Sequence, residues 1–409
     1  MAELSGLLSG LRVIDCATYI AGPAAAVVMS DFGAEVIKVE RPPFGDPYRY
    51  LHLVPVMPVS DQNYCWLLDG RNKKSLALDL GDPGGREALL KLVATADVFI
   101  TNYQPALVRK FALSFDDLRP RNDRLVYAQV TGYGEAGQDV DRPGYDLTAY
   151  WARSGMMGSM HNADGEPALS PAGFGDHPTA MALFGAIMLA LYQREKTGKG
   201  SRVTTSLIAN GAWANSCAIQ AALCEAVFSP KSTRLTTLNP IVNHYVTRDQ
   251  QRFITCCLDP KKDWPNLCRA LGKPELIDDQ RFCTPEVRRA HAPELVAIID
   301  SAVGGRDMAD WVRIFRDHDV IWGPVPSIQQ VAKDHQMGSN GVFPRIRGGP
   351  ATVDSPIRVD GSPKIPPALA PGVGEHSAEV LSSLGYSESE IKDMVERGIT
   401  MATSPQPRA

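Results

Sequence analysis

Short apolar runs alternate with longer amphipathic segments along the first half of the chain. Residues 11–15 and 33–40 are rich in β-branched side chains, and residues 21–29 between them have the composition of a helix from Pro23 onward. This order of strand, helix and strand predicts a parallel sheet with a right-handed crossover. The same alternation continues through predicted strands at 75–80, 97–101, 125–130 and 201–207 and predicted helices at 82–96, 105–111 and 115–118. The fold class is therefore α/β.

The most apolar stretch of the chain runs from residue 179 to residue 196 and predicts a long helix. Pro178 suits its first turn, because proline has a fixed φ and no backbone N–H to satisfy. Apolar side chains cover nearly all of its faces, which predicts burial in a core. Gly198 is expected to end this helix, and an Ala-rich helix is expected over residues 208–227.

The pattern changes near residue 228, and two strands and three helices are expected between residues 243 and 322. We therefore expect a large domain from residue 1 to 225 and a smaller α+β domain over 226–330. Residues 331–409 are expected to return to the large domain and to end in a helical hairpin at 376–397. The tail, 401–409, is expected to be disordered.

Composition excludes several classes of function. Apolar residues make up 44% of the chain and charged residues 22%, as in ordinary globular proteins, and the formal net charge of −4 argues against nucleic acid or an anionic membrane as partner. The first residues lack the regions of a signal peptide, and the stretch 179–192 is too short to span a bilayer. A cytoplasmic protein is expected. Its cysteines and histidines are dispersed without zinc spacing, so no metal site is expected.

One carboxylate, Asp176, stands at the start of the long apolar helix, inside the Gly- and Pro-rich segment 170–179. Unpaired N–H groups and the helix dipole favour a carboxylate there by about 0.3–1 kcal/mol, so Asp176 is expected to be ionised at neutral pH. Gly173 and Gly175 leave the adjoining backbone free of side chains, which would let a substrate approach. A helix N-cap is the commoner role of such an aspartate, and the local sequence leaves both roles open.

Two other polar features precede this segment. The basic cluster at 71–74 is either a solvated turn or an anion site. Asp146 opens a predicted helix that runs to Ala152 and is by default its N-cap. Neither the Gly-rich run 131–137 nor the loop after the first strand carries a P-loop or dinucleotide fingerprint, so nucleotide phosphate binding by those motifs is not expected.

Six short motifs follow one another along the chain. They are Leu8-x-Gly-Leu-Arg-Val-Ile-Asp15, Ala21-Gly-Pro23, Gly33-Ala-Glu-Val-Ile-Lys-Val-Glu40, Asn72-Lys-Lys-Ser75, Gly175-Asp176 and Thr197-Gly-Lys-Gly200. Together, and in this order, they resemble the class III coenzyme A (CoA) transferases, also called the CaiB/BaiF family. The resemblance runs from residue 8 to about 207 and resumes in the C-terminal hairpin. It implies a doubly wound, Rossmann-like large domain built from both chain ends, a smaller inserted domain, and two interlocked subunits in a dimer.

The resemblance also implies a chemistry for Asp176. In the family, the aspartate after the glycine attacks an acyl-CoA thioester, and an acyl-aspartyl anhydride and then an aspartyl-CoA thioester are formed. A carboxylate suits this role, because its anhydride and its thioester are close enough in reactivity to interchange. Asp146 is expected to be the second carboxylate of the site, as an orienting group or proton partner. CoA acts as a substrate here, and no tightly bound cofactor is expected.

The family's CoA contacts carry over in part. Some transferases have a lysine where this chain has Gly81 and Pro143, so Arg71, Lys73 or Lys74 is considered as a replacement contact for the anionic end of CoA. The positions that match the family's contacts are Ala21, Arg41, Leu78, Asn102, Tyr103 and Lys110.

Tyr145 separates two subclasses of the family. Members that racemise 2-methylacyl-CoA carry a histidine at this position as a second base, and tyrosine is a poor base at neutral pH. CoA transfer, with succinyl-CoA among the candidate donors, is therefore favoured over racemisation. The spacing from Gly132 to Gly155 resembles the branch acting on aryl or branched-chain acids, whose acyl pocket Met156, Met157 and Met160 are considered to line. A non-catalytic CoA-binding subunit remains a third hypothesis, so the partner is a second copy or a related chain.

Overall fold

The computed structural model describes residues 6–401, which form two compact units. The large unit contains residues 6–158, 169–224 and 341–401, and the smaller unit contains residues 159–168 and 225–340. The smaller unit is thus wider than the expected 226–330. One reason is a hydrogen bond from the backbone N–H of Ala163 to the carbonyl of Ser232, which ties residues 159–168 to it. Two expectations fall on residues outside this range. Residues 1–5 belong to the start that was expected to lack a signal peptide, and residues 402–409 belong to the tail that was expected to be disordered.

The large unit is built on one parallel sheet of six strands. The order β3-β2-β1-β4-β5-β6 is that of a doubly wound Rossmann-like sheet, so the expected fold class is confirmed. The direction of strand order reverses between β1 and β4, the position at which such sheets bind ligands. The strands are β1 (Arg12–Asp15), β2 (Glu35–Glu40), β3 (Lys73–Ala77), β4 (Val98–Thr101), β5 (Val126–Thr131) and β6 (Arg202–Ser206).

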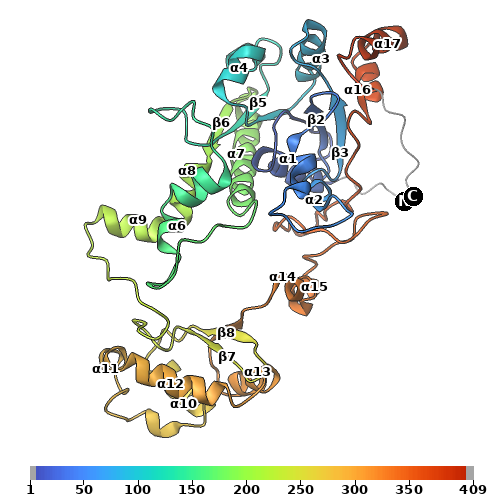
Figure 1. Cartoon of the computed structure of the whole chain (residues 1–409). Coiled ribbons are helices and arrows are strands. Elements are labelled where there is room, and N and C mark those ends of the chain that lie inside the picture. Colours follow the sequence, from blue (N-terminus) through green and yellow to red (C-terminus); the bar gives the residue numbers. More distant parts are fainter. Residues whose placement is uncertain (1–5, 402–409) are drawn as a thin grey trace. The chain divides into compact units, whose positions relative to one another are not determined.

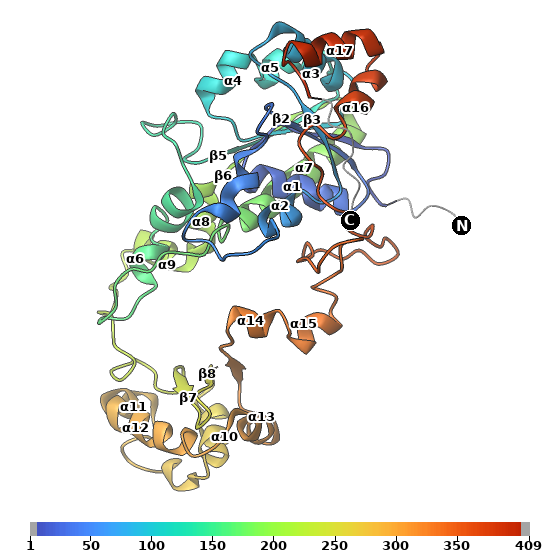
Figure 2. The ribbon, with the colours of Figure 1, turned by 45° about the vertical axis from the view of Figure 1, so that its right-hand side comes forward.

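Helices cover both faces of this sheet (Figures 1 and 2). Alternating strand side chains feed two cores, because successive residues of a strand point to opposite faces: Val13 enters one core and Ile14 the other. On the first face lie α1 (Ala21–Asp31), α2 (Tyr64–Asp69) and α7 (Asp176–Thr197). On the second lie α3 (Pro83–Val93), α4 (Pro105–Phe111), α5 (Phe115–Leu118), α16 (Ser377–Ser383) and α17 (Glu388–Glu396).

Helix α7 confirms the predicted long helix but not its complete burial. Leu183 and Ile187 are fully buried in the core that α7 shares with α1, whereas Leu189 and Tyr192 are 71% and 60% exposed. The helix covers the sheet with one side only, so residues 6–401 leave apolar side chains on its outer side uncovered. Gly198, with a φ of +72°, ends the helix as expected.

The predicted helix 208–227 is broken in the structure. It consists of α8 (Leu207–Ala214) and α9 (Ser216–Leu223), separated at Asn215, whose amide donates to the carbonyl of Ser154 at 3.0 Å. Glu225 has a left-handed φ of +56°, which is incompatible with further helix. The remaining elements of the large unit are the 3₁₀ helix η1 (Pro47–Leu53), the π-helix η2 (Asp146–Ala152) and α6 (Met156–Ser159).

The smaller unit has an antiparallel sheet of β7 (His244–Val246), β8 (Arg252–Thr255) and β9 (Trp322–Pro324), packed with helices. Strand β9 was not predicted. The core of the smaller unit is aromatic and includes the fully buried Trp264, Trp311 and Phe253. The helices are α10 (Asp263–Ala270), η3 (Pro274–Leu276), α11 (Pro285–Ala290), α12 (Ala292–Val303), α13 (Met308–Asp317), α14 (Ile328–Val331) and α15 (His335–Ser339). Over the described part of the chain, no helix combines the length and apolarity that crossing a bilayer demands.

Candidate active site

Two adjoining cavities lie at the carboxyl end of the sheet, where the strand order reverses. The larger, of about 770 Å³, is lined by residues 39–47 and 78–81, and the smaller, of about 350 Å³, contains Asp146 and Asp176. Thr18, Tyr103 and Leu107 line both. The loops after β1 and β4 thus form the boundary between the two cavities, as expected for ligand binding in an open parallel sheet.

Asp176 is the first residue of α7, and Asp146 holds the turn before it. Asp146 is only 8% exposed, and both of its carboxylate oxygens accept the backbone N–H of Gly175 at 3.0 Å. The expectation that Asp146 caps its own helix is therefore wrong: Tyr145 is the N-cap of η2, and Asp146 is its first residue. Two carboxylates that are distant in sequence meet at the start of one helix.

The pKa of Asp176 corrects a second expectation. Burial, and then the negative charge of Asp146, raise the pKa of Asp176 to about 7, against an opposing effect of His177. The helix N-terminus stabilises the carboxylate too weakly to offset this desolvation. Asp176 is therefore only partly ionised at neutral pH. Burial also raises the pKa of Asp146, against the hydrogen bond from Gly175.

The two glycines before Asp176 are required by the conformation and packing of the turn, and they do not open a path for substrate. A Cβ on Gly175 would lie 2.2 Å from Cγ of Tyr150 and 2.5 Å from Oδ1 of Asp146. Gly173 has a φ of +76°, which a side chain would strain. The expected open approach along this backbone is thus wrong, because the space beside Gly175 is filled by the ring and the carboxylate that position the nucleophile.

We expect Gly175→Ala to destabilise the fold by about 1–3 kcal/mol, the usual cost of overpacking, and to lower activity by displacing Asp146. The matched control is Gly185→Ala in the same helix, where an added Cβ meets nothing within 4 Å. That substitution should stabilise the fold by up to about 1 kcal/mol. Urea unfolding of both variants measures the difference, and equal stabilities would contradict this account of Gly175.

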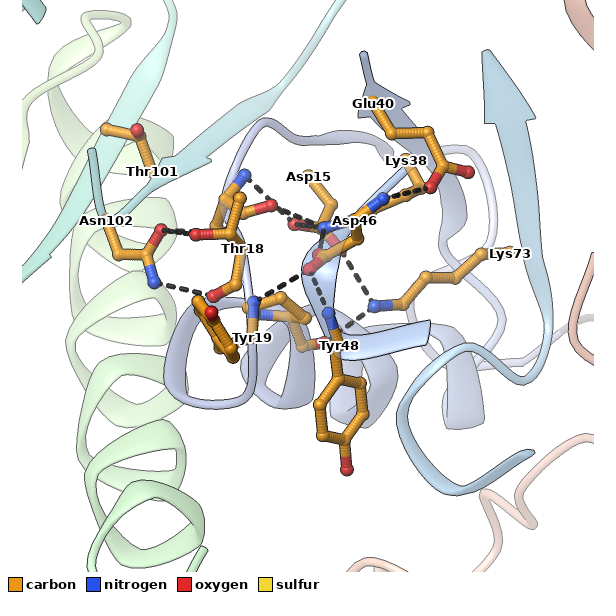
Figure 3. A network of polar contacts seen from close by, with 12 residues as sticks. Asp15, Thr18, Tyr19, Lys38, Glu40, Asp46, Tyr48, Lys73, Thr101 and Asn102 are labelled. Atoms are coloured by element: carbon orange, nitrogen blue, oxygen red, sulfur yellow. Dashed lines mark hydrogen bonds and ion pairs between the residues drawn. The ribbon is translucent and has the colours of Figure 1, made fainter. Parts of the chain in front are cut away.

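A cluster of four buried charges lies beneath the loop that separates the cavities (Figure 3). Nζ of Lys38 is 2.7 Å from Asp46 and 3.5 Å from Asp15, and Nζ of Lys73 donates to Asp15 at 2.8 Å. Burial lowers the pKa of Lys38, but the two carboxylates outweigh it and raise the pKa above its ordinary value. Two cations and two anions therefore balance in a space closed to solvent.

This cluster fixes the loop after β1 (Figure 3). Lys38 donates to the carbonyl of Ala17, and Asp46 accepts the N–H of Tyr19 at 3.1 Å, while Tyr19 has a φ of +61° that tyrosine rarely adopts. The side-chain amide of Asn102 pairs with the backbone of Thr18 in both directions, at 2.7 and 2.8 Å. The loop is thus held by the ion-paired side chains of Lys38 and Asp46 and by the amide of Asn102.

The six predicted CoA contacts all lie around these two cavities. Arg41, Leu78 and Lys110 line the larger, Ala21 and Asn102 line the smaller, and Tyr103 lines both. The amide of Asn102 is used by Thr18, so this residue positions the loop. Residues from four separate segments of the sequence therefore surround the space next to Asp176.

A comparison with protein families explains this arrangement. The model of CoA-transferase family III matches residues 8–377. The chain belongs to CoA-transferase family III. Its members are enzymes, and the predicted family is thereby confirmed.

Relatives with different substrates share this family. The chain is 32% identical to cinnamoyl-CoA:phenyllactate CoA-transferase of Clostridium sporogenes, over 96% of this chain and 97% of the relative. It is 30% identical to succinyl-CoA:glutarate CoA-transferase of Mus musculus, over 96% and 90%. The crystal structure of a CaiB/BaiF family protein from Brucella suis matches with a TM-score of 0.81 and 28% identity, covering 93% of this chain and 100% of that one.

The basic cluster of this family III transferase is neither a solvated turn nor an anion site. Arg71 pairs with Asp31 at 2.8 Å, Lys73 with Asp15, and Lys74 with both Glu35 and Glu379. These three cations are used within the fold, so they do not replace the lysines missing at Gly81 and Pro143. Another cation, which was not predicted, shares a cavity with Gly81. Arg86 of α3 lines this cavity together with Gly81 and Lys110, and its Nε has no hydrogen-bond partner within residues 6–401.

The methionines expected in an acyl pocket lie elsewhere. Met156 is 3% exposed in a core with Tyr150 and Trp151, and Met157 packs against that core. Met160 belongs to the smaller unit and is 56% exposed. None of the three lines the cavity that contains Asp176. Met156 and Met157 are core filling, because they pack against residues of η2 and α8.

Sequence reasoning missed the groups behind Asp176. Nε2 of His177 lies 3.4 Å from a carboxylate oxygen of Asp69, and the hydroxyl of Tyr48 donates to the other oxygen at 2.7 Å. The position of His177 directly after Asp176 was the one available signal. Asp69 and Tyr48 could not be found, because only the fold brings α2 and η1 against the start of α7.

Proposed function

We propose that this transferase moves CoA from an acyl-CoA to a free carboxylic acid, with Asp176 as nucleophile. The supporting observation is the position of Asp176: its carboxylate lines a small, largely apolar cavity that adjoins a second cavity large enough for part of CoA. A thioester that lies across the boundary would place its carbonyl next to Asp176. The proposed roles are nucleophile for Asp176 and orienting group for Asp146.

The proposed reaction consists of two acyl-exchange stages, one with the donor and one with the acceptor, and both take place at the carboxylate of Asp176. An oxygen of Asp176 attacks the thioester carbon, and CoA thiolate leaves an acyl-aspartyl anhydride. The thiolate then attacks the aspartyl carbon and releases the donor acid, so that an aspartyl-CoA thioester remains. The acceptor carboxylate opens this thioester through a second anhydride, and the returning thiolate takes the new acyl group and frees Asp176. No net proton is consumed.

The lining of the smaller cavity supports an aryl or branched-chain acid. The rings of Tyr19 and Tyr145 meet edge to face at 6.0 Å, and Ile20, Val130 and Leu207 line the same space. These surfaces suit an apolar acyl group, as in the phenyllactate relative. Arg142 also lines this cavity, and a succinyl donor would bring a free carboxylate toward it.

Cations that line the larger cavity and its neighbour support binding of the anionic part of CoA. Arg41 and Lys110 line that cavity, and Arg86 joins Lys110 in the neighbouring one. No acidic side chain of residues 6–401 forms an ion pair with any of the three. Unpaired cations are suited to phosphate groups.

The test is a substrate panel. The purified chain is incubated with succinyl-CoA, acetyl-CoA and cinnamoyl-CoA, each with aryl, branched and dicarboxylic acceptors, and CoA products are identified by mass. We expect new acyl-CoA species with aryl or branched acids. Exchange of the α-hydrogen in deuterated water without an acceptor would instead support the racemase hypothesis. Activity that appears only after a related chain is added would support a non-catalytic subunit.

The pKa of Asp176 predicts the pH dependence of transfer. Only the ionised carboxylate attacks, so kcat/KM should fall as pH decreases through about 7 and reach a plateau above pH 8. Asp146→Asn removes a negative charge that raises this pKa, so its profile should shift to lower pH. A profile that is flat from pH 6 to 8 in the wild-type enzyme would contradict the role of Asp176.

We also propose a homodimer, because a large apolar surface is uncovered in the single chain. Leu189 of α7, Trp213 of α8 and Leu223 of α9 are 71%, 80% and 73% exposed. Large apolar side chains that are exposed on three helices in succession are typical of a surface that another protein covers. Sedimentation should give the mass of two chains. A monomer at micromolar concentration would contradict this proposal, and a mixed complex with a related chain would replace it.

A further inference from the structure

His177, the residue after the nucleophile, is held between two oxygen atoms that only accept hydrogen bonds. Its Nδ1 lies 3.0 Å from the carbonyl oxygen of Gly173, and its Nε2 lies 3.4 Å from Oδ1 of Asp69. Asp69 is 2% exposed, and its other oxygen accepts the hydroxyl of Tyr48. The ring is therefore fixed at both nitrogens, by the turn before α7 and by the end of α2.

This geometry favours the protonated form of the ring. A neutral imidazole carries a proton on one nitrogen only and would leave the other facing an acceptor oxygen without a hydrogen. Two acceptors are satisfied together only by the imidazolium, in which both nitrogens donate. Burial lowers the pKa of His177. The negative charge of Asp69 and the hydrogen bonds to Asp69 and to the carbonyl of Gly173 outweigh this effect and raise the pKa to about 9. Both lines of reasoning give a cation at neutral pH.

We propose that His177 is a positioning residue for Asp176: as an imidazolium held by Asp69, it fixes the turn that presents the nucleophile and supplies the positive charge that favours the ionised form of this carboxylate. The proposal rests on the proposed role of Asp176. It assigns Asp69 and Tyr48 to the support of that cation, although neither lines the cavity that contains the nucleophile.

The charges around Asp176 show why such a cation is needed. Asp146 on η2 and Asp69 on α2 both raise the pKa of Asp176, and His177 is the cation that lowers it. Burial raises the pKa of Asp69, but His177 and Tyr48 outweigh it, so Asp69 remains a carboxylate. Without the imidazolium, three carboxylates would meet at the start of α7, and Asp176 would stay protonated at neutral pH.

The test compares pH profiles. His177→Gln keeps a neutral donor at this position but removes the charge, so the midpoint of kcat/KM should rise by about one pH unit or more. Activity at pH 7 should fall about fivefold or more and should recover toward the wild-type value near pH 9. Asp69→Asn should also neutralise the ring, but it removes a negative charge that raises the pKa of Asp176, so its upward shift should be smaller than that of His177→Gln. The double variant has lost the same two charges and should show the same midpoint as Asp69→Asn. His291→Gln, an exposed histidine of the smaller unit, is the control and should keep the wild-type profile.

A second readout does not depend on activity. The ¹⁵N shifts of the His177 ring should show both nitrogens protonated at pH 7.5, and Asp69→Asn should return the ring to neutral at that pH. A neutral ring in the wild-type protein, or a uniform loss of activity at all pH values in His177→Gln, would overturn the proposal. Absence of CoA transfer in the wild-type enzyme would instead overturn the proposed function, while the ring shifts would still report the imidazolium.

Discussion

Replacement of Asp176 by asparagine is expected to lower kcat for CoA transfer by at least about 10³-fold, the scale seen when a nucleophile is removed. The amide has nearly the shape of the carboxylate, so the start of α7 and both cavities should persist. Asparagine cannot form the acyl anhydride or the CoA thioester, and both halves of the exchange stop. Steady-state rates with the best donor and acceptor from the substrate panel measure this loss.

Two controls separate loss of chemistry from loss of structure. CoA binding by Asp176→Asn should stay within a few-fold of wild type, because the cations Arg41 and Lys110 at the larger cavity are unchanged. Wild-type enzyme incubated with acyl-CoA should yield a hydroxylamine-sensitive adduct on the peptide that contains Asp176, and the variant should yield none. Full activity in the variant would refute the nucleophile.

Lys38→Met is expected to destabilise the large unit by about 3–5 kcal/mol, the cost of leaving buried charges without their partner. Lys38 and Asp15 are fully buried, and Asp46 is 2% exposed, so neither carboxylate gains solvent when the ammonium is removed. Lys73 still pairs with Asp15, but Asp46 keeps only backbone donors. Urea unfolding measures the change in free energy.

Lys74→Met is the matched control for that variant. Lys74 lies on β3, the strand next to β2, where it is paired with Ile37, the residue before Lys38. Its ion pairs with Glu35 and Glu379, however, are partly exposed to solvent. Such surface pairs contribute about 0–1 kcal/mol. If the two variants lost equal stability, the buried cluster would not be the source of the loss. Lys38→Met should also lower transfer activity, because the loop at Ala17 loses its anchor.

The local pattern predicted the elements well where local forces decide. The strands and helices that were predicted in the first half lie within a few residues of their expected positions, and α4 and α5 have the expected bounds, whereas η1 and α2 were not predicted. The errors have tertiary causes. The helix expected at 208–227 breaks at Asn215, where a side chain bonds to Ser154, and the outer side of α7 is exposed because the sheet covers only one side.

The chemistry of the site was predicted less completely than its position. Asp176 and Asp146 were found, but their relation was not, because nothing local shows that Asp146 accepts the N–H of Gly175. The basic cluster was left open between a solvated turn and an anion site, since sequence cannot show that Arg71 faces Asp31 in a buried pair. The charge state of Asp176 was wrong for the same reason: the helix dipole is a local property, whereas desolvation and the charge of Asp146 depend on the fold.

The sequence alone thus determined the α/β class, the family and the identity of the candidate nucleophile, because strand and helix periodicity and short motifs are local. Only the tertiary structure decided how Asp176 is used. It brings Asp146, His177 and Asp69 from three separate helices to one point, and buries the two carboxylates there. Electrostatic energies depend on distance and burial rather than on order along the chain, so the reactivity of this carboxylate is a property of the fold.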